Sequence, residues 1–227
     1  MVRILVTNDD GWDAPGLAAL KSVAGRLGEV FVLAPRDPHS YAGHCVTTDS
    51  ELTLAETGSQ EFTLTGTPAD CVRLGLTTLF PNIDWVLSGI NRGGNLGADL
   101  FTSGTVAAVR EAALLGRPGI AVSQYVRKGM ALDWERSGEL ALPVIEQLIA
   151  EGCPPKGYWN VNLPHVEAGE SAGLVRCDPD NEPLDIRFRR DGDRFHYDGS
   201  YASRRRTPGR DVEQCFGGSI TVSRLSL

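Results

Sequence analysis

Short apolar runs alternate with helical patterns through residue 124, and this alternation limits the fold more than any other feature of the sequence. The apolar runs have the length and the Val, Ile and Leu content of buried strands. Strands that alternate with helices form βαβ units, in which the strands pair in parallel and the helices cover the sheet. The expected strands are 3–8, 29–34, 84–88 and 119–123, and the expected helices are 15–25, 68–79 and 103–115.

Three later segments change this rhythm. Residues 51–66 contain two alternating runs around Thr57-Gly58-Ser59, which predicts a hairpin. Residues 134–150 have helical composition, and we expect Pro143 to kink or split that helix. The run that starts at Tyr158 predicts one more strand.

The composition and the pattern of the sequence change after Pro164. Gly, Asp and Arg become more frequent, and short alternating runs such as "DIRFRR", "RFHYDG" and "SITVSRL" suggest extended hairpins. Arms of this kind often pair with another subunit. We therefore expect a catalytic core over residues 1–164 and an extended arm over residues 165–227, whose last strand returns to the core.

The composition is that of an ordinary globular protein, with 41% hydrophobic and 22% charged residues in 227. No apolar run approaches the roughly 20 residues that cross a bilayer. The first residues resemble no signal peptide, so we expect a cytoplasmic protein without membrane contacts. The five cysteines are scattered and show no zinc-binding spacing, which favours free thiols.

The net charge is −7, which argues against a surface that binds a nucleic-acid polymer. It still permits a locally positive pocket. A small anionic substrate is therefore compatible with the composition.

Two adjacent carboxylates, Asp9 and Asp10, follow the first expected strand. Like charges this close repel, and a bound cation is one reason to keep them together. Neighbouring side chains on a strand point to opposite faces, so both reach one ion only where Gly11 turns the chain. The alternative is that one aspartate caps the next helix and the other is solvated. Ser40 and Asn91, at the ends of strands expected beside the first, would add the neutral oxygens that suit Mg²⁺, Mn²⁺ or Ca²⁺.

Ser103-Gly104-Thr105 opens the third expected helix. Exposed backbone N–H groups at a helix start, together with two hydroxyl groups, form a ready site for phosphate. An ordinary N-cap is the simpler reading of this tripeptide taken alone. Next to a divalent cation, however, a phosphate cradle completes the minimum equipment for phosphoryl transfer.

Other polar residues are weaker candidates. The loop "NRGGNLG", residues 91–97, lacks the spacing of a dinucleotide site, and Asn95 either contacts the substrate or forms a turn. His39 and His44 flank Ser40, and either could protonate a leaving alkoxide or simply be solvated. Arg204-Arg205-Arg206 could meet phosphate, although a solvated turn is the plainer interpretation.

Taken together, these stretches resemble the SurE family, the survival-protein-E nucleotidases. The matching segments keep the family's order over residues 4–164, and the combination of Thr-Asn-Asp-Asp-Gly with Ser-Gly-Ile-Asn is specific. They are "ILVTNDDGWDAPGL", "VFVLAPRDPHSYAGHCVT", "GTPADCV", "DWVLSGINRGGNLGADLFTSGTVAAVREAALLGRPGIAVS" and, more weakly, "WNVNLP".

The resemblance implies a Rossmann-like, mostly parallel sheet flanked by helices, and a metal-dependent phosphomonoesterase of nucleoside 5'- and 3'-monophosphates that sometimes acts on polyphosphate. It implies one divalent metal ion per subunit, Mg²⁺ or Mn²⁺, with Ca²⁺ as a further option. It also implies a homodimer or homotetramer built through the arm.

The motif match assigns roles to single residues. The metal ligands fall on Asp9, Asp10, Ser40 and Asn91, and the phosphate contacts fall on Asn8, Ser103, Gly104 and Thr105. The catalytic roles fall on Asp9 and Asn8, and we place Asn95 and His44 near the substrate.

Residues 165–215 depart from the family pattern, and only "RDVEQCFGGSITVSRL" resembles its usual ending. Beside the activity that the resemblance implies, three alternatives stay open. One is an aspartyl-phosphate phosphatase, which requires an Asp-x-Asp motif after the first strand, where this chain has two adjacent aspartates. The second is a nucleotide-binding module without turnover, and the third is an enzyme that acts mainly on polyphosphate.

Overall fold

The computed structural model describes residues 1–80, 82–153, 155–167 and 169–227. Across these residues a nine-stranded sheet has the strand order β3-β4-β2-β1-β5-β6-β7-β11-β8. The six central strands from β4 to β7 are mutually parallel. They are β1 (Val2–Thr7), β2 (Gly28–Pro35), β4 (Glu61–Leu64), β5 (Trp85–Arg92), β6 (Gly119–Gln124) and β7 (Gly157–Leu163). The expected mostly parallel, Rossmann-like α/β fold is confirmed.

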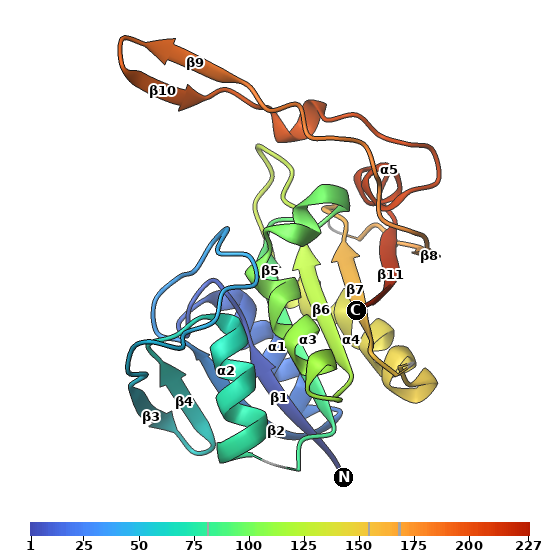
Figure 1. Cartoon of the computed structure of the whole chain (residues 1–227). Helices are drawn as coiled ribbons and strands as arrows, with labels where there is room; N and C mark the ends of the chain where they lie inside the picture. Colours follow the sequence, from blue (N-terminus) through green and yellow to red (C-terminus); the bar gives the residue numbers. More distant parts are fainter. Residues whose placement is uncertain (81, 154, 168) are drawn as a thin grey trace.

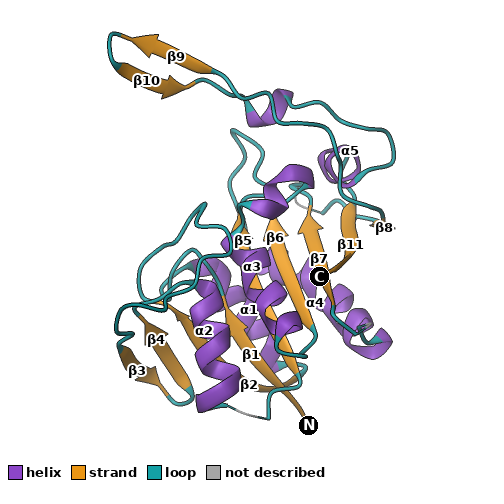
Figure 2. Ribbon diagram, in the orientation of Figure 1, coloured by secondary structure: helices purple, strands orange, loops and turns teal. Residues whose placement is uncertain are grey.

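Helices cover both faces of this sheet (Figure 2). The alternation of side chains along β1 shows why, because Ile4 and Val6 enter one core while Leu5 enters the other. The first core packs against α1 (Pro15–Gly25) and α4 (Trp134–Glu151), and the second packs against α2 (Pro68–Leu74) and α3 (Gly104–Leu114). The apolar runs of the parallel strands are thus buried on both sides.

The helix starts follow local signals. Thr67 and Asp70 form a reciprocal capping box at the start of α2. Ser103 caps α3, and Asp133 caps α4. The helix expected over 68–79 is α-helical only to Leu74, and it continues as a wider turn in which the N–H of Phe80 donates to the carbonyl oxygen of Gly75 at 2.7 Å.

Of the two outcomes expected at Pro143, a kink or a split, the split is wrong. α4 runs through it as one helix of 18 residues. Pro143 lies on the exposed side, while Ala141, Val144 and Ile145 are buried in the core. This packing offsets the backbone hydrogen bond that a proline removes.

The expected hairpin is formed by β3 (Leu54–Gly58) and β4, and β4 also pairs in parallel with β2. At the other end of the sheet, β11 (Ile220–Ser226) lies antiparallel to β7, and β8 (Leu174–Arg176) pairs with β11. The last strand of the chain therefore returns to the sheet.

The segment after β8 leaves the sheet and crosses beyond the carboxyl ends of β5 and β6 (Figure 1). It carries an antiparallel hairpin of β9 (Phe188–Asp191) and β10 (Arg194–Tyr197), whose residues are all exposed. The hairpin confirms the expected C-terminal extended arm. The chain returns through α5 (Asp211–Phe216), which the sequence analysis did not predict because six residues are too short to show helical periodicity. No helix in the described parts of the chain has the length and apolar character needed to span a membrane.

Candidate active site

The carboxyl ends of β1, β2 and β5 bring most of the predicted site residues to one edge of the sheet. A cavity of about 700 Å³ lies there, and we call it the site cavity. Its walls include Asp9, Asp10, Ser40, Asn91, Asn95 and Ser103. Residues from four separate segments of the core thus share one space.

Asp9 is buried at the end of β1, with 5% of its surface exposed. Its Oδ1 accepts a hydrogen bond of 2.5 Å from Thr105 Oγ1, and its backbone oxygen accepts one of 2.8 Å from the N–H of His39. Burial raises the pKa of Asp9 to about 6, and the charge of Asp10 adds to this rise while the hydroxyl of Thr105 opposes it. An ionised Asp9 is therefore costly unless positive charge lies nearby.

The start of α3 is the first source of such charge. A Cβ atom placed on Gly104 would lie 2.8 Å from the Cβ of Asp9, so glycine is what allows this close approach. Ser103 Oγ accepts the N–H of Val106 at 3.1 Å, as an N-cap does. The first N–H groups of a helix have no partner inside the helix, so this end carries a partial positive charge.

Asp10 follows β1, and Asn91 lies near the end of the neighbouring strand β5; the chain at Gly11 turns with φ +102°. Asp10 Oδ2 accepts the N–H of Arg92 at 2.9 Å. Asn91 Nδ2 donates to the carbonyl oxygen of Gly93 at 2.8 Å, which leaves its side-chain oxygen as an acceptor toward other groups. Ser40 is exposed on the loop that follows β2.

β5 extends beyond the expected strand 84–88, and its pairing with β6 shifts register between Ser88 and Asn91. This irregularity at the strand end directs Asn91 toward the same edge as the aspartates. The expected proximity of Asp9, Asp10, Ser40 and Asn91 is thus seen in the shared cavity.

Asn8 is buried next to Asp9 and outside the described lining of the site cavity. Its Nδ2 donates to the carbonyl oxygen of Gly11 at 2.7 Å, and its buried Oδ1 finds no hydrogen-bond partner among the described residues. A buried acceptor without a partner costs about 1–3 kcal/mol. The site therefore offers Oδ1 to a donor such as a bound water or a protonated phosphate oxygen.

The donor set fits a hard divalent cation. No group of three or more His, Cys, Asp or Glu side chains is placed to hold a metal anywhere in the described ranges, so an ion here would combine two carboxylates with neutral oxygens. Asp9, Asp10, Ser40 and Asn91 offer only oxygen atoms, which Mg²⁺, Mn²⁺ and Ca²⁺ prefer. The unfavourable burial of Asp9 is a second observation that a cation would relieve.

Asn95 is held by a buried network. Its backbone N–H donates to Asn162 Oδ1 at 2.8 Å, and its Nδ2 donates to Ser123 Oγ at 2.7 Å. The carbonyl oxygen of Asn95 accepts from Nδ2 of Asn160 and of Asn162. These contacts fix the loop 91–97 against the ends of β6 and β7, with Asn95 on the cavity wall.

The two histidines that flank Ser40 lie outside the site cavity. His44 Nε2 is 2.7 Å from Oε2 of the buried Glu111, which Arg73 also contacts at 2.6 Å. Neither His44 nor His39 belongs to the described lining of the site cavity. The expected position of His44 near the substrate, and a role of either histidine as general acid, therefore find no support in the cavity lining.

Arg204, which the sequence left as part of a solvated turn, is buried. Only 7% of its surface is exposed, and NH1 lies 2.6 Å from Asp99 Oδ2. Arg205 is solvent-exposed as expected, since 79% of its side chain is exposed.

The sequence analysis missed five residues that line the site cavity: Asp99, Tyr41, Tyr125, Tyr197 and Tyr201. These residues lie in loops and short elements, where no local pattern in the sequence indicates which side chains face a cavity.

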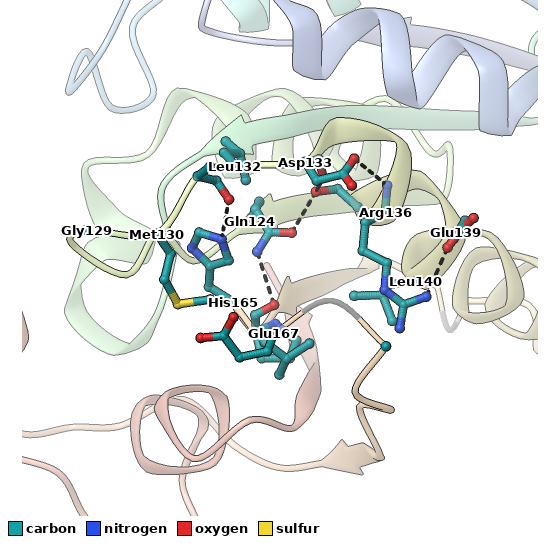
Figure 3. Close-up of a pocket in the computed structure, with 15 residues that line it drawn as sticks. Gln124, Gly129, Met130, Leu132, Asp133, Arg136, Glu139, Leu140, His165 and Glu167 are labelled. Carbon is teal, nitrogen blue, oxygen red and sulfur yellow. Dashed lines mark hydrogen bonds and ion pairs between the residues drawn. The ribbon is translucent and has the colours of Figure 1, made fainter.

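A second pocket, of about 650 Å³, lies beside the start of α4 (Figure 3). It holds none of the predicted site residues. Its polar groups are mostly engaged with one another: Ser137 Oγ donates to Gln124 Oε1 at 2.8 Å, and His165 Nε2 lies 3.1 Å from the carbonyl oxygen of Ala131. The predicted ligands of a metal ion and phosphate therefore line the site cavity and not this second pocket.

The sequence over residues 4–182 matches the family model described as survival protein SurE. The chain belongs to the SurE family. Two relatives are named putative 5'-nucleotidases: one from Synechocystis sp. is 44% identical, and one from Nostoc sp. is 47% identical, with 99% of both chains covered in each case. The 5'-nucleotidase SurE of Paramagnetospirillum magneticum is 38% identical over 99% of this chain and 89% of its own. The crystal structure of the SurE protein from Aquifex aeolicus superimposes with a TM-score of 0.88 at 31% identity, covering 99% of this chain and 93% of that one.

Proposed function

We propose that this SurE-family protein is a metal-dependent phosphomonoesterase that hydrolyses nucleoside 5'- and 3'-monophosphates to nucleoside and phosphate. The names of its relatives support nucleotidase activity. The observation that carries the proposal is the position of Asp9, a buried carboxylate set against the start of α3 in a cavity shared with Asp10, Ser40 and Asn91. A cation site next to a helix N-terminus suits a phosphate ester.

Asp9, Asp10, Ser40 and Asn91 would hold one divalent ion per subunit, Mg²⁺ or Mn²⁺, and Ca²⁺ would fit the same oxygens. Such an ion supplies charge neutralisation and a lower pKa for water. Residues of this chain would bind the phosphate group and orient the attacking water.

The backbone N–H group of Gly104 would bind a phosphate oxygen, because it begins α3, whereas the hydroxyl and the backbone N–H of Thr105 both act on the Asp9 carboxylate. Ser103 Oγ accepts from Val106 and still has its own proton to donate. Asn8 Oδ1 would accept a hydrogen bond from the attacking water or from a protonated phosphate oxygen and so orient it.

Two other activities compete with this proposal. A nucleotide-binding module without turnover draws support from the cavity walls, because no histidine in the described lining could act as general acid. Activity mainly on polyphosphate would use the same cation and helix start. Adjacent acids, one of them hydrogen-bonded to Thr105, argue against an aspartyl-phosphate mechanism.

The exposed hairpin β9–β10 supports a further part of the proposal, a homodimer or homotetramer formed through the arm. Its aromatic side chains, among them Phe188, project into solvent in the single chain. Size-exclusion chromatography with light scattering measures the assembly directly.

The test is hydrolysis of p-nitrophenyl phosphate, a set of nucleoside monophosphates and polyphosphate, with Mg²⁺, Mn²⁺ or chelator. We expect metal-stimulated phosphate release that is nearly abolished in Asp9→Asn. Asp13→Asn is the matched control, because Asp13 is exposed on the same loop and outside the described cavity lining. Full activity of Asp9→Asn would contradict the assignment, and nucleotide binding without phosphate release would favour the module.

A further inference from the structure

The site cavity has two chemically different ends. One is polar and is built by the core, with Asp9 and Ser103. The other is built by the arm, where the apolar and aromatic side chains of Leu184, Ile186, Tyr197 and Tyr201 line the same walls beside the charged Asp185 and Arg204. Figure 1 shows this segment, in orange, crossing beyond the ends of the sheet strands.

Three tyrosines with large exposed surfaces line this cavity: Tyr41, Tyr197 and Tyr201, which are 89%, 62% and 41% exposed. Tyr41 belongs to the loop of Ser40, and the other two belong to the arm. Exposed aromatic rings gathered around one cavity mark a binding surface.

The base of the arm is attached to residues 94–99 of the core. Besides its ion pair with Asp99, Arg204 donates from NH2 to the carbonyl oxygen of Leu96 at 3.2 Å. The Tyr201 hydroxyl lies 3.1 Å from both the carbonyl oxygen of Gly94 and Asp99 Oδ2. The arm is therefore anchored to the segment that directly follows Asn91.

Tyr197 contacts two neighbours within the arm. The ring of Phe188 meets it edge-on, with centroids 5.7 Å apart and planes at 75°. The hydroxyl end of the Tyr197 ring also lies so close to Gly199 that a Cβ atom there would collide with it. Gly199 is thus the position that lets Tyr197 lie against the backbone at the cavity wall.

From this arrangement we propose that the arm supplies the nucleobase subsite, with Tyr197 as its aromatic platform. The inference rests on the proposed function and deepens it: the core would bind the phosphate, and the arm would bind the nucleoside. An aromatic ring stacks on any base, since every base has a π-face. Tyr197 is a specificity-determining residue in this scheme, because it contacts the leaving nucleoside and not the reacting phosphate.

Continuity with the candidate active site argues for this occupant. A nucleoside monophosphate carries its anionic and aromatic parts at opposite ends, as the cavity does. A second copy of the chain packed on Tyr197 is the competing occupant, and the experiment separates the two.

Adenosine is the direct probe, because it has no phosphate and its binding does not depend on hydrolysis. Calorimetric titration should show adenosine binding to the full-length protein, weakened about tenfold in Tyr197→Ala, within the range for stacking a base on an aromatic side chain. Gly199→Ala, which pushes the ring aside without removing it, should weaken binding in the same direction. Phe195→Ala is the matched control: it removes an equally exposed ring from β10 outside the described cavity lining, and it should bind like the wild type.

Hydrolysis adds a second measurement. The ratio of kcat/KM for AMP to kcat/KM for ribose 5-phosphate, which lacks the base, should fall about tenfold in Tyr197→Ala. The proposal is overturned if adenosine does not bind, if Tyr197→Ala leaves binding and this ratio unchanged, or if Phe195→Ala has the same effect through a changed oligomeric state. If the wild type binds adenosine but releases no phosphate, the proposed function fails and the subsite stands.

Discussion

Thr105 donates a hydrogen bond of 2.5 Å to the carboxylate of Asp9, and this contact joins the end of β1 to the first turn of α3. The two residues are 96 positions apart in the chain. The bond lowers the pKa of Asp9 against the effect of burial, so it favours the charged form that a cation needs.

Thr105→Val should therefore reduce activity with little change of shape. A hydrogen bond to a charged group contributes about 1.5–3 kcal/mol, which corresponds to a loss of about 10- to 100-fold. The measurement is kcat/KM as a function of Mn²⁺ concentration. Thr105→Ser keeps the hydroxyl and should retain most of the activity; equal loss in both variants would show that the methyl group matters instead.

Gly104→Ala should inactivate the enzyme, although alanine favours a helix by about 1 kcal/mol. The added Cβ would lie 2.8 Å from the Cβ of Asp9, so the carboxylate must move. Gly138→Ala in α4 is the control, because its Cβ would meet only ordinary contact, 3.5 Å from a methyl group of Val23. Thermal unfolding and phosphatase assays together check this prediction, and an active Gly104→Ala variant would contradict it.

The metal-free protein should lose stability as the pH rises from about 4 to about 6, through Asp9. The pKa of Asp9 is about 6 in the folded state and 3.8 when solvated. Because its folded-state pKa is raised, the folded state binds more protons than the unfolded state in this window, and stability falls with increasing pH. At 1.36 kcal/mol per pH unit this group contributes at most about 3 kcal/mol.

Asp9→Asn removes that titration. In chelator the variant should unfold at higher denaturant concentration than the wild type above pH 6, and at nearly the same concentration near pH 4. Added Mn²⁺ should stabilise the wild type and not the variant. A variant that is less stable than the wild type at pH 7 without metal would refute the argument.

Arg204→Ala should destabilise the protein by about 3–5 kcal/mol, because it leaves Asp99 without its partner in a buried ion pair. Urea denaturation measures the loss. Arg205→Ala is the control: Arg205 is 3.9 Å from Glu182 and largely exposed, so we expect a change within about 0.5 kcal/mol. Similar effects of the two substitutions would mean that the Asp99 pair is not a structural anchor.

Much of the fold could be predicted because its signals are local. The runs that became β1 and β6 are short and apolar, and the helix starts at Thr67 and Ser103 have their capping residues within three positions. The aspartates after β1 could be placed at the site edge because parallel strands end together there. β8 and α5 escaped prediction, since three and six residues are too few to show a period.

The sequence by itself determined the parallel sheet, the two-sided core and the oxygen-rich edge, because each depends on residues that are close in the chain. Only the tertiary structure decided that His44 faces Glu111, that Arg204 is buried against Asp99, and that Tyr197 shares a cavity with Asp9. These pairs are separated by 67, 105 and 188 positions. Contacts over such separations arise when strands and helices pack, so no local pattern in the sequence encodes them.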